Sequence, residues 1–588
     1  MRSTRRLKLL VIWTVVVAVL AVGGAAIAGA ALLAQAQEAR GHLVAARDAA
    51  ESLGAAVRGG DAASVQALSE SMSRELHTAE DIVSTPLWTV AAAVPWVGPN
   101  LDAVRAMTRA GVVIDEQARV PGVEIMTDLS TESLATAGAG VDLAPFRRAE
   151  DALPQISAAV GEANATLSDI DTTAVVPEVA EAVKSFSAAL AGVQPMVQNL
   201  HDTLPTLLDM AGGNGGREYL VIFQNNAEAR ATGGNPSAMA LLRVADGRAT
   251  LDEQADSSTF YAADLVGKDI VDVAPQVRAL YESDTWQFPQ NYTRTPDFPS
   301  TAHMFDALWT KSTGTTVDGV ISLDPVALAH VLEVTGPVTL SDGSAISADT
   351  AVSLLLRDTY ERFGSDGGAA DKYFEQVVRN VFEVIAQGRW SPIPMVEALS
   401  RGVTEHRTLA WMRNPDEQAA VERAGMSGTF APAGRDVGVF INDSSHSKLE
   451  YYLSKSINVD CDKTTGLLST TITLTSTAPA EGLPAYAQGQ RNRRMGLPGS
   501  TMLLDVVFFA TPGNDITLVN PLTGAVPAWV RSGVDGGRAG HSVTVALAAG
   551  QTMTVSAVST FDPSMGVDSV RFTPGVSDTP VSFTGGCS

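Results

Sequence analysis

Cysteine is nearly absent from this sequence of 588 residues, which contains two, Cys461 and Cys587. Zinc sites and thiol-redox motifs need more ligands or closer spacings, so the sequence excludes both kinds of site. If the chain is exported, the two cysteines are expected to form a disulfide that ties the last residues to an earlier strand. The alternative is a pair of inert buried thiols.

Basic residues are scarce as well: Lys and Arg number 41 against 65 Asp and Glu, which gives a formal net charge of −24. A protein that binds nucleic acid must present excess Lys and Arg over a broad face, so nucleic acid is excluded as a partner. Any anionic ligand would have to be held by a local cluster of arginines. The sequence also lacks a Walker loop, a G-x-S-x-G elbow, an H-E-x-x-H motif and a dinucleotide fingerprint, and its eight histidines are scattered.

Charged side chains are missing altogether from residues 9–33, which follow a basic tail at 1–8. The length of this run fits a bilayer core, and the basic residues precede it. The pattern predicts a transmembrane helix at 9–33, a cytoplasmic N-terminus and a localisation at the cell membrane, with the bulk of the chain outside the cytoplasm. Ala34-Gln35-Ala36 resembles a cleavage site, so release by cleavage is the open alternative.

Residues 34–210 are rich in Ala, Glu, Gln, Leu and Arg with apolar residues at helical spacing, which predicts an all-helical region. Gly59-Gly60-Asp61 ends a first helix and supplies an N-cap for a second. The apolar segment Thr85–Pro99 contains two tryptophans and three prolines; it either touches a bilayer surface or is a buried connection. The expected helices are 36–57, 62–84, about 101–120, 122–137, 143–170 and 176–210.

Residues 217–425 alternate strands with helices, which predicts an α/β sandwich. Tyr219–Phe223 is an apolar run typical of a buried strand, and Gly319–Leu323 is a second. The polar segment Gln224–Gly234 is expected to form a loop with a flexible glycine pair, at the end of a strand, where open α/β sheets hold ligands. The other expected elements are strands at 238–244, 249–253 and 407–412, a hairpin at 336–343, and helices at 269–283, 301–313, 326–333, 348–363, 370–387 and 415–424.

Residues 430–588 are rich in Thr, Val, Ser and Gly in alternating runs, which predicts an all-β sandwich. Two segments are unusual in it. Asn442–Lys448 is polar and is expected to form a turn, whereas Arg491–Arg494 is a basic loop that either contacts an acidic wall polymer or is simply solvated. The expected strands include 437–441, 467–475, 502–510 and 542–547.

The polar segment after the first strand also carries a resemblance. Its signature, Gln224-Asn225-Asn226-Ala227-Glu228-x-Arg230-Ala231-Thr232-Gly233-Gly234, is followed by Asp297–Ser300, Val317–Ile321 and Thr335–Val338. Together these motifs are similar to the family called domain of unknown function 4012, and the similarity extends over nearly the whole chain. The members of that family are actinobacterial membrane proteins, so the resemblance implies a membrane protein without an assigned activity.

A more remote resemblance is to the LytR-CpsA-Psr family, membrane-anchored enzymes that transfer glycopolymers from a lipid pyrophosphate carrier to the cell wall. The order of elements is similar: a strand, an acid-x-Arg loop, a hairpin, a Gly-Val strand and an arginine-bearing helix pair. Glu228 and Arg230 match that family's Asp-x-Arg, and Arg357, Arg362 and Arg379 fall where its helix-borne arginines lie. The resemblance implies arginines that bind pyrophosphate and acidic residues that bind a divalent metal such as magnesium.

The chain departs from the pattern of the LytR-CpsA-Psr family at two places. Asn235-Pro236-Ser237 stands where that family has an acidic residue, and Asp256-Ser257-Ser258-Thr259 stands where it has Pro-Arg-Asp-Thr. Metal-assisted phosphoryl transfer without those positions would lack much of its charge stabilisation.

We therefore predict a multidomain α+β protein with a transmembrane helix, a helical region, an α/β core resembling LytR-CpsA-Psr and a β-sandwich. Its expected function is to bind lipid-pyrophosphate-linked glycopolymer or to transfer it to the cell wall, as a phosphotransferase-type ligase. The candidate catalytic residues are Glu228 and Arg230, and the candidate ligand-binding residues are Asn225, Asn226, Arg230, Arg357, Arg362 and Arg379. The alternative is a non-enzymatic envelope scaffold or binding protein on a degenerate version of the fold, in which Glu228 and Arg230 form a salt bridge that braces the loop and the asparagines cap turns.

Overall fold

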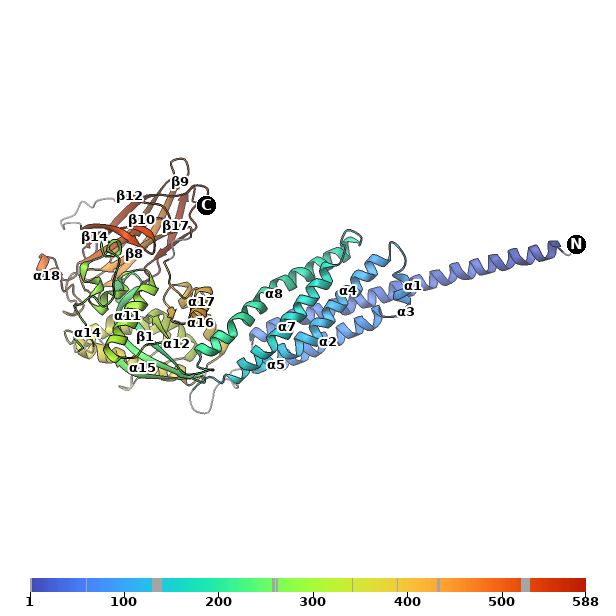
Figure 1. Ribbon diagram of the computed structural model, residues 1–588, viewed down its shortest axis with the longest axis horizontal. Helices are drawn as coiled ribbons and strands as arrows, with labels where there is room; N and C mark the ends of the chain where they lie inside the picture. Colours follow the sequence, from blue (N-terminus) through green and yellow to red (C-terminus); the bar gives the residue numbers. More distant parts are fainter. Residues whose placement is uncertain are drawn as a thin grey trace. The chain divides into compact units, whose positions relative to one another are not determined.

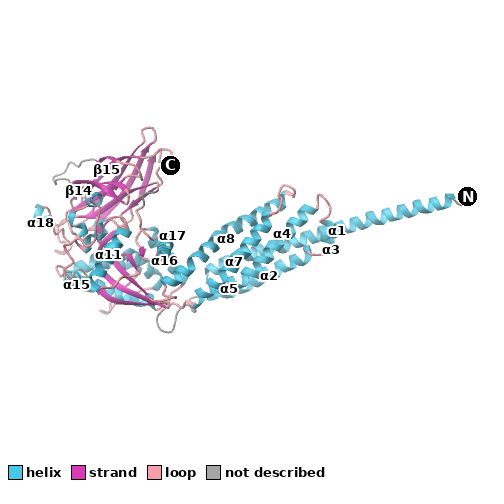
Figure 2. Ribbon diagram, in the orientation of Figure 1, coloured by secondary structure: helices cyan, strands magenta, loops and turns pink. Residues whose placement is uncertain are grey.

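A computed structural model describes residues 3–59, 61–128, 140–255, 260, 263–340, 342–388, 390–430, 434–519 and 529–587. The chain forms two compact units, one from residues 1–134 and 143–208 and the other from 135–142 and 209–588. The first is helical, and the second contains all the β-sheets that the structure describes (Figures 1 and 2). A multidomain α+β architecture with a helical N-terminal region is thus confirmed.

The helical unit begins with one long helix that packs against the next. Asp61 caps the second helix by accepting a hydrogen bond from the backbone N–H of Ser64, as predicted. Small and apolar side chains of both helices, including Ala46 and Leu76, share a core with Val112. The helices are α1 (Ser3–Gly59), α2 (Ala62–Val83), α3 (Pro86–Ala91), α4 (Gly98–Ile114), α5 (Val120–Asp128), α7 (Ala144–Ser168) and α8 (Pro177–Met210), with a π-helical turn at Asp115–Arg119.

The prediction of a transmembrane helix at 9–33 is wrong. Over the ranges that the structure describes, no helix is both long enough and apolar enough to cross a membrane. Residues 9–33 are not a separate element but the first part of α1, which continues without a break through charged residues to Gly59.

The two tryptophans of Thr85–Pro99 have opposite environments. Trp88, on α3, is fully buried, and its Nε1 donates a hydrogen bond to the carbonyl oxygen of Leu101 at 3.3 Å. Trp96, in the turn before α4, is 81% exposed, and Val90 is 72% exposed. Trp88 therefore fits the alternative of a buried connection. Contact with a bilayer stays a prediction for Trp96.

The second unit starts with a five-stranded sheet in the order β3-β2-β1-β4-β7. Strand β1 pairs antiparallel with β2 and parallel with β4. Leu220 and Ile222 on one face pack with Phe305 of α11, while Tyr219 on the other face packs with Met412. The strands are β1 (Arg217–Arg230), β2 (Gly233–Ala245), β3 (Arg248–Ala255), β4 (Gly319–Leu323) and β7 (Leu409–Met412), beside the hairpin β5 (Val338–Thr339) and β6 (Ala345–Ile346).

The helices of this α/β part largely agree with the expected ranges, with two differences. The predicted helix 269–283 is reduced to α10 (Pro275–Arg278), followed by two 3₁₀ helices at Ser283–Trp286 and Pro289–Arg294 whose aromatic residues are buried. Helix α16 (Pro392–Thr404) was not predicted; it begins at a proline, which fits the first turn of a helix. The remaining helices are α11 (Phe298–Thr313), α12 (Pro325–Thr335), α13 (Ala348–Ser353), α14 (Thr359–Phe363), α15 (Gly367–Ala386) and α17 (Pro415–Arg423).

The C-terminal part is the predicted β-sandwich. Two five-stranded sheets, β12-β15-β10-β9-β17 and β13-β14-β11-β8-β16, enclose a core of Val, Ile, Leu and Phe side chains. The bounds are β8 (Asp436–Asp443), β9 (Leu453–Asp462), β10 (Leu467–Ser476), β11 (Met502–Phe509), β12 (Ile516–Val519), β13 (Val530–Asp535), β14 (Arg538–Leu547), β15 (Thr552–Thr560), β16 (Ser569–Phe572) and β17 (Val581–Gly585), with the short helix α18 (Asn492–Met495).

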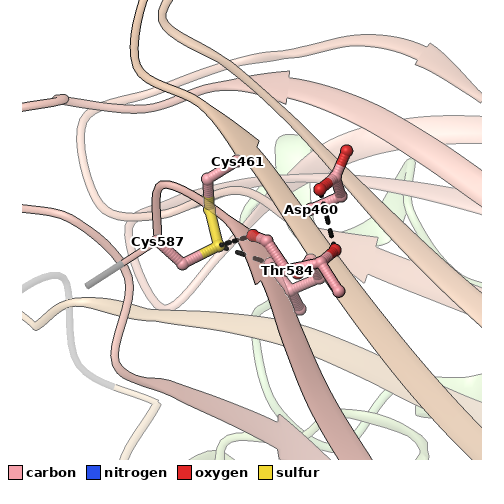
Figure 3. Close-up of a disulfide and its surroundings, with 5 residues drawn as sticks. Asp460, Cys461, Thr584 and Cys587 are labelled. Atoms are coloured by element: carbon pink, nitrogen blue, oxygen red, sulfur yellow. Dashed lines mark hydrogen bonds between the residues drawn. A yellow bond between two sulfur atoms is a disulfide. The ribbon is translucent and has the colours of Figure 1, made fainter.

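The predicted disulfide between Cys461 and Cys587 is present, and the alternative of two free thiols is wrong. It joins positions 126 residues apart (Figure 3). The hydroxyl of Thr584 donates to the carboxylate of Asp460 beside it, at 2.7 Å. The disulfide therefore fixes the end of the chain to β9.

Candidate functional site

The segment that was expected to be a loop is instead a continuation of β1. Strand β1 runs to Arg230 and β2 starts at Gly233, and their pairing shifts register between Asn225 and Ala229. The three residues between them form a bulge, a feature that re-aims side chains out of a ladder. Gln224 holds the base of the bulge, because its amide donates to Ser322 at 2.6 Å and accepts from the backbone N–H of Gly234 at 3.0 Å.

The glycine pair after the bulge is required by close packing. A Cβ on Gly234 would lie 2.3 Å from the carbonyl carbon of Asn225, which is backbone that cannot move aside. Gly233 has a φ of 135°, a conformation that L side chains rarely adopt. The pair, which was predicted to be flexible, therefore permits the close approach of β2 to the bulge.

The two asparagines connect the bulge to helices far along the chain. The amide of Asn225 donates to the hydroxyl of Tyr360 on α14 at 2.5 Å and accepts from the N–H of Ala227 at 3.0 Å. The amide of Asn226 donates to Asp324 at 2.9 Å, and Asp324 also caps α12. Asn225 thus takes part in a turn, as the alternative prediction had it, and both asparagines also make long-range contacts.

Glu228 and Arg230 form a buried ion pair. The Nη2 of Arg230 lies 2.5 Å from Oε1 of Glu228, and Lys448 from the loop after β8 contacts the other carboxylate oxygen. Burial alone would raise the pKa of Glu228, but the charges of Lys448 and Arg230 outweigh burial and hold it below its usual range. Arg230 also donates to the carbonyl oxygen of Asp443 at 3.0 Å, so the ion pair joins β1 to the sandwich.

A polar pocket of about 260 Å³ lies over this network. The charged residues in its lining are Glu228 and Lys448, and their charges cancel. His446 adds no charge at pH 7, because burial lowers its pKa to about 4. The ring of Tyr486 lies 5.9 Å from that of Tyr360 and is within 5.9 Å of the Lys448 ammonium. The lining consists of Asn225, Glu228, Asn235, Pro236, Ser237, Gln290, Tyr360, His446, Lys448, Tyr486 and Gln490.

The predicted arginines do not converge on this pocket. Arg230 is fully buried beneath it, and none of the four candidates is among the lining residues. Arg357 pairs with Asp358 at 2.7 Å and lies over the ring of Tyr451. Arg362 pairs with Asp342 at 3.0 Å, and Arg379 is exposed on α15.

The structure does not supply a donor set for the divalent metal that the remote resemblance implied. In the described part of the chain, no three His, Cys, Asp or Glu side chains lie close enough to hold a metal ion together. Near the pocket, the carboxylate of Asp443 is occupied by the hydroxyl and backbone N–H groups of Ser445 and Ser447. The segment Asp256–Thr259 lies outside the described residues.

Several lining residues were missed by sequence reasoning. His446 and Lys448 belong to the polar run that was expected to be only a turn, and Tyr486 and Gln490 precede the basic loop. Their unusual composition was the one available signal. Their partners lie far away in sequence: Lys448 is 220 residues from Glu228 and Tyr360 is 135 residues from Asn225.

Fold and site together define a class of protein in which an α/β sheet domain and a β-sandwich share a small polar pocket built on a bulged strand. Residues 214–360 match the family described as protein of unknown function (DUF4012), which confirms the predicted resemblance over that segment. The matched segment includes the bulge and Tyr360 but not the sandwich, although the predicted resemblance extended over nearly the whole chain. No curated protein and no solved structure matches the chain, and the remote resemblance to LytR-CpsA-Psr stays a prediction.

Proposed function

We propose that this chain is a cell-envelope protein that binds one sugar unit of a wall or lipid-linked glycopolymer in the pocket and holds it without transferring it. The chemistry of the lining supports this function. Amides such as Asn235 and Gln490 can both donate to and accept from sugar hydroxyls, and the rings of Tyr360 and Tyr486 offer apolar surface to the C–H groups of a sugar. The volume is below the range of drug-sized ligand pockets, which favours a single ring.

The charge of the pocket favours binding over pyrophosphate transfer. Transfer would need arginines or a metal beside the phosphates to stabilise developing charge. The lining charges of Glu228 and Lys448 cancel, and the predicted arginines lie elsewhere. The geometry therefore favours the non-enzymatic alternative over a phosphotransferase-type ligase.

The disulfide supports a location outside the cytoplasm. Disulfides persist in oxidising compartments and are rare in reducing ones. Cys461 and Cys587 are both buried and joined in the folded sandwich. A protein with this bond is suited to the cell envelope, where wall glycopolymers are found.

The test is a glycan array probed with the full-length chain, followed by calorimetry on the oligosaccharides that bind. Tyr486→Ala should weaken binding by about tenfold or more, and Gln490→Ala by a few-fold, because each removes a lining group. Gln387→Ala, an exposed glutamine outside the pocket, is the control and should bind normally. No binding to any glycan, or binding equal in the pocket variants and the control, would refute the proposal.

The same protein should be incubated with a polyprenyl-pyrophosphate-linked glycan and a wall acceptor, with and without magnesium. We expect no transfer product by mass spectrometry. A product that is formed by wild type and by Gln387→Ala, but is lost in Tyr486→Ala, would show transfer at the pocket and reject a purely binding role.

A further inference from the structure

The loop that closes one side of the pocket is rigidly held. Tyr486 and Gln490 line the pocket, and the same loop continues into α18. Asn492 is fully buried, and its amide donates to the carbonyl oxygens of Pro498 at 2.8 Å and Thr501 at 2.6 Å. The loop therefore keeps a fixed position beside the pocket.

Arg491 adds a second attachment to the body of the unit. Its Nη1 donates to Glu282 at 2.8 Å and to the carbonyl oxygen of Ser444 at 3.0 Å. Its backbone N–H donates to Ser445, next to the lining residue His446. The first arginine of the basic loop is thus structural, and its charge is used internally.

The next two arginines are different. Arg493 and Arg494 are exposed on α18, and within the described ranges neither side chain forms an ion pair or a hydrogen bond. Figure 1 shows α18 standing at the edge of the second unit. The two arginines follow the lining residue Gln490 by three and four positions in the sequence. Arg357 and Arg362, by contrast, are paired with Asp358 and Asp342.

We infer that the ligand is an anionic glycan, whose sugar occupies the pocket while Arg493 and Arg494 bind phosphate or carboxylate groups on the adjoining units. This inference rests on the proposed function. A chain with a net charge of −24 repels anionic polymers in general. Two exposed guanidinium groups without an acidic partner among the described residues, on the segment that follows the lining residue Gln490, create a local attraction. Guanidinium groups bind both phosphate and carboxylate with paired hydrogen bonds.

The experiment compares neutral oligosaccharides with phosphodiester-linked and uronic-acid oligosaccharides of equal length, at about 50 and 300 mM salt. At low salt the wild-type chain should bind the anionic members about tenfold tighter than the neutral ones, and high salt should remove much of that advantage because exposed charges are screened. R493E/R494E should lose the advantage and bind the neutral members normally. The two anionic arms show whether phosphate or carboxylate is preferred.

The matched control is K372E/R423E, which changes two exposed cations of the same unit and alters the net charge equally. It should retain the preference for anionic members. The inference is wrong if wild type shows no preference, if R493E/R494E keeps it, or if the control loses it to the same extent. In each of those outcomes, binding of neutral oligosaccharides that is lost in Tyr486→Ala would still support the proposed function. Failure of this inference can therefore be distinguished from failure of the proposed function.

Discussion

Glu228 is a buried carboxylate held between two cations, Arg230 and Lys448. Removing one member of such a network leaves the other charges buried and unpaired. The free-energy cost of an unpaired buried charge is larger than the net stabilisation that the intact pair provides. We expect Glu228→Gln to lower the free energy of unfolding by about 3–5 kcal/mol. Urea denaturation followed by circular dichroism measures the change.

The control for that prediction is an exposed pair. Arg362→Gln breaks the contact with Asp342, in which the Arg362 side chain is 52% exposed, and should change the stability by about 1 kcal/mol or less. Adding Lys448→Met to Glu228→Gln removes one of the stranded cations and should recover part of the loss. Equal effects of Glu228→Gln and Arg362→Gln would contradict the buried network.

His446 should make the protein sensitive to mild acid. Burial lowers its pKa from 6.5 to about 4, so between these values the unfolded chain binds a proton that the folded chain does not. Its contribution to stability is complete above pH 6.5 and is lost as the pH falls toward 4. His446→Asn should therefore lose less stability than wild type across this window, and Asn tolerates the φ of 54° at this position.

The comparison must be between variant and wild type, because other groups act in the opposite direction. Burial raises the pKa values of Asp443 and Asp535, so these carboxyls favour the folded state as the pH falls. His406→Asn tests the same effect away from the pocket, since burial also lowers the pKa of His406 to about 4. Identical pH profiles of wild type and His446→Asn would show that His446 does not titrate differently on folding.

At the scale of elements, the segment from α3 to α4 contains one tryptophan that packs in the core, Trp88, and one that is exposed to solvent, Trp96. Trp88→Ala removes a fully buried side chain and should destabilise the helical unit by about 3–5 kcal/mol. Trp96→Ala should change its stability by about 0.5 kcal/mol or less, because Trp96 is 81% exposed. Thermal unfolding of the two variants distinguishes them.

The same pair of variants tests the predicted contact with a bilayer. If Thr85–Pro99 touches lipid, wild type should sediment with phospholipid vesicles and Trp96→Ala should do so several-fold less, because Trp is favoured at the headgroup level. Met196→Ala, which removes another exposed apolar side chain of the helical unit, is the control. Equal sedimentation of all three proteins would leave Trp96 without a role at membranes.

Elements whose signals are local could be predicted from the sequence. The strand Gly319–Leu323 and the N-cap Asp61 were both predicted as the structure has them, because apolar runs and capping residues act within a few positions. The continuation of β1 through Gln224–Arg230 could not be predicted in this way. A polar run resembles a loop unless its distant partners are known, and Gln224 finds Ser322 98 residues away.

The candidate site was predicted only in part for the same reason. Glu228 and Asn225 were identified and do line the pocket, and the salt bridge of Glu228 with Arg230 agrees with the alternative prediction. The arginines on the helices were placed by resemblance of element order, which does not determine where a side chain lies. Lys448 reaches the pocket only because the sandwich packs against the end of β1.

At the scale of the whole molecule, the chain returns at its end to both sheets of the sandwich. Strand β16 pairs parallel with β8, and β17 pairs parallel with β9. All five residues of β17 are exposed, so little apolar burial holds this strand in place. Its attachment depends on backbone hydrogen bonds and on the disulfide between Cys461 and Cys587.

The disulfide should therefore stabilise the molecule globally and β17 locally. Replacing both cysteines by serine frees a loop of 126 residues in the unfolded chain, and the expected loss of stability is about 2–5 kcal/mol. Hydrogen exchange followed by mass spectrometry should show faster exchange in β17 than the loss of global stability alone explains. The central strand β10, which has a neighbouring strand on each edge, should exchange faster only by the amount that the loss of global stability explains. Uniformly faster exchange in all strands would mean that the bond acts only on the unfolded chain. Unchanged exchange in β17 would mean that its ladder with β9 is sufficient without the bond.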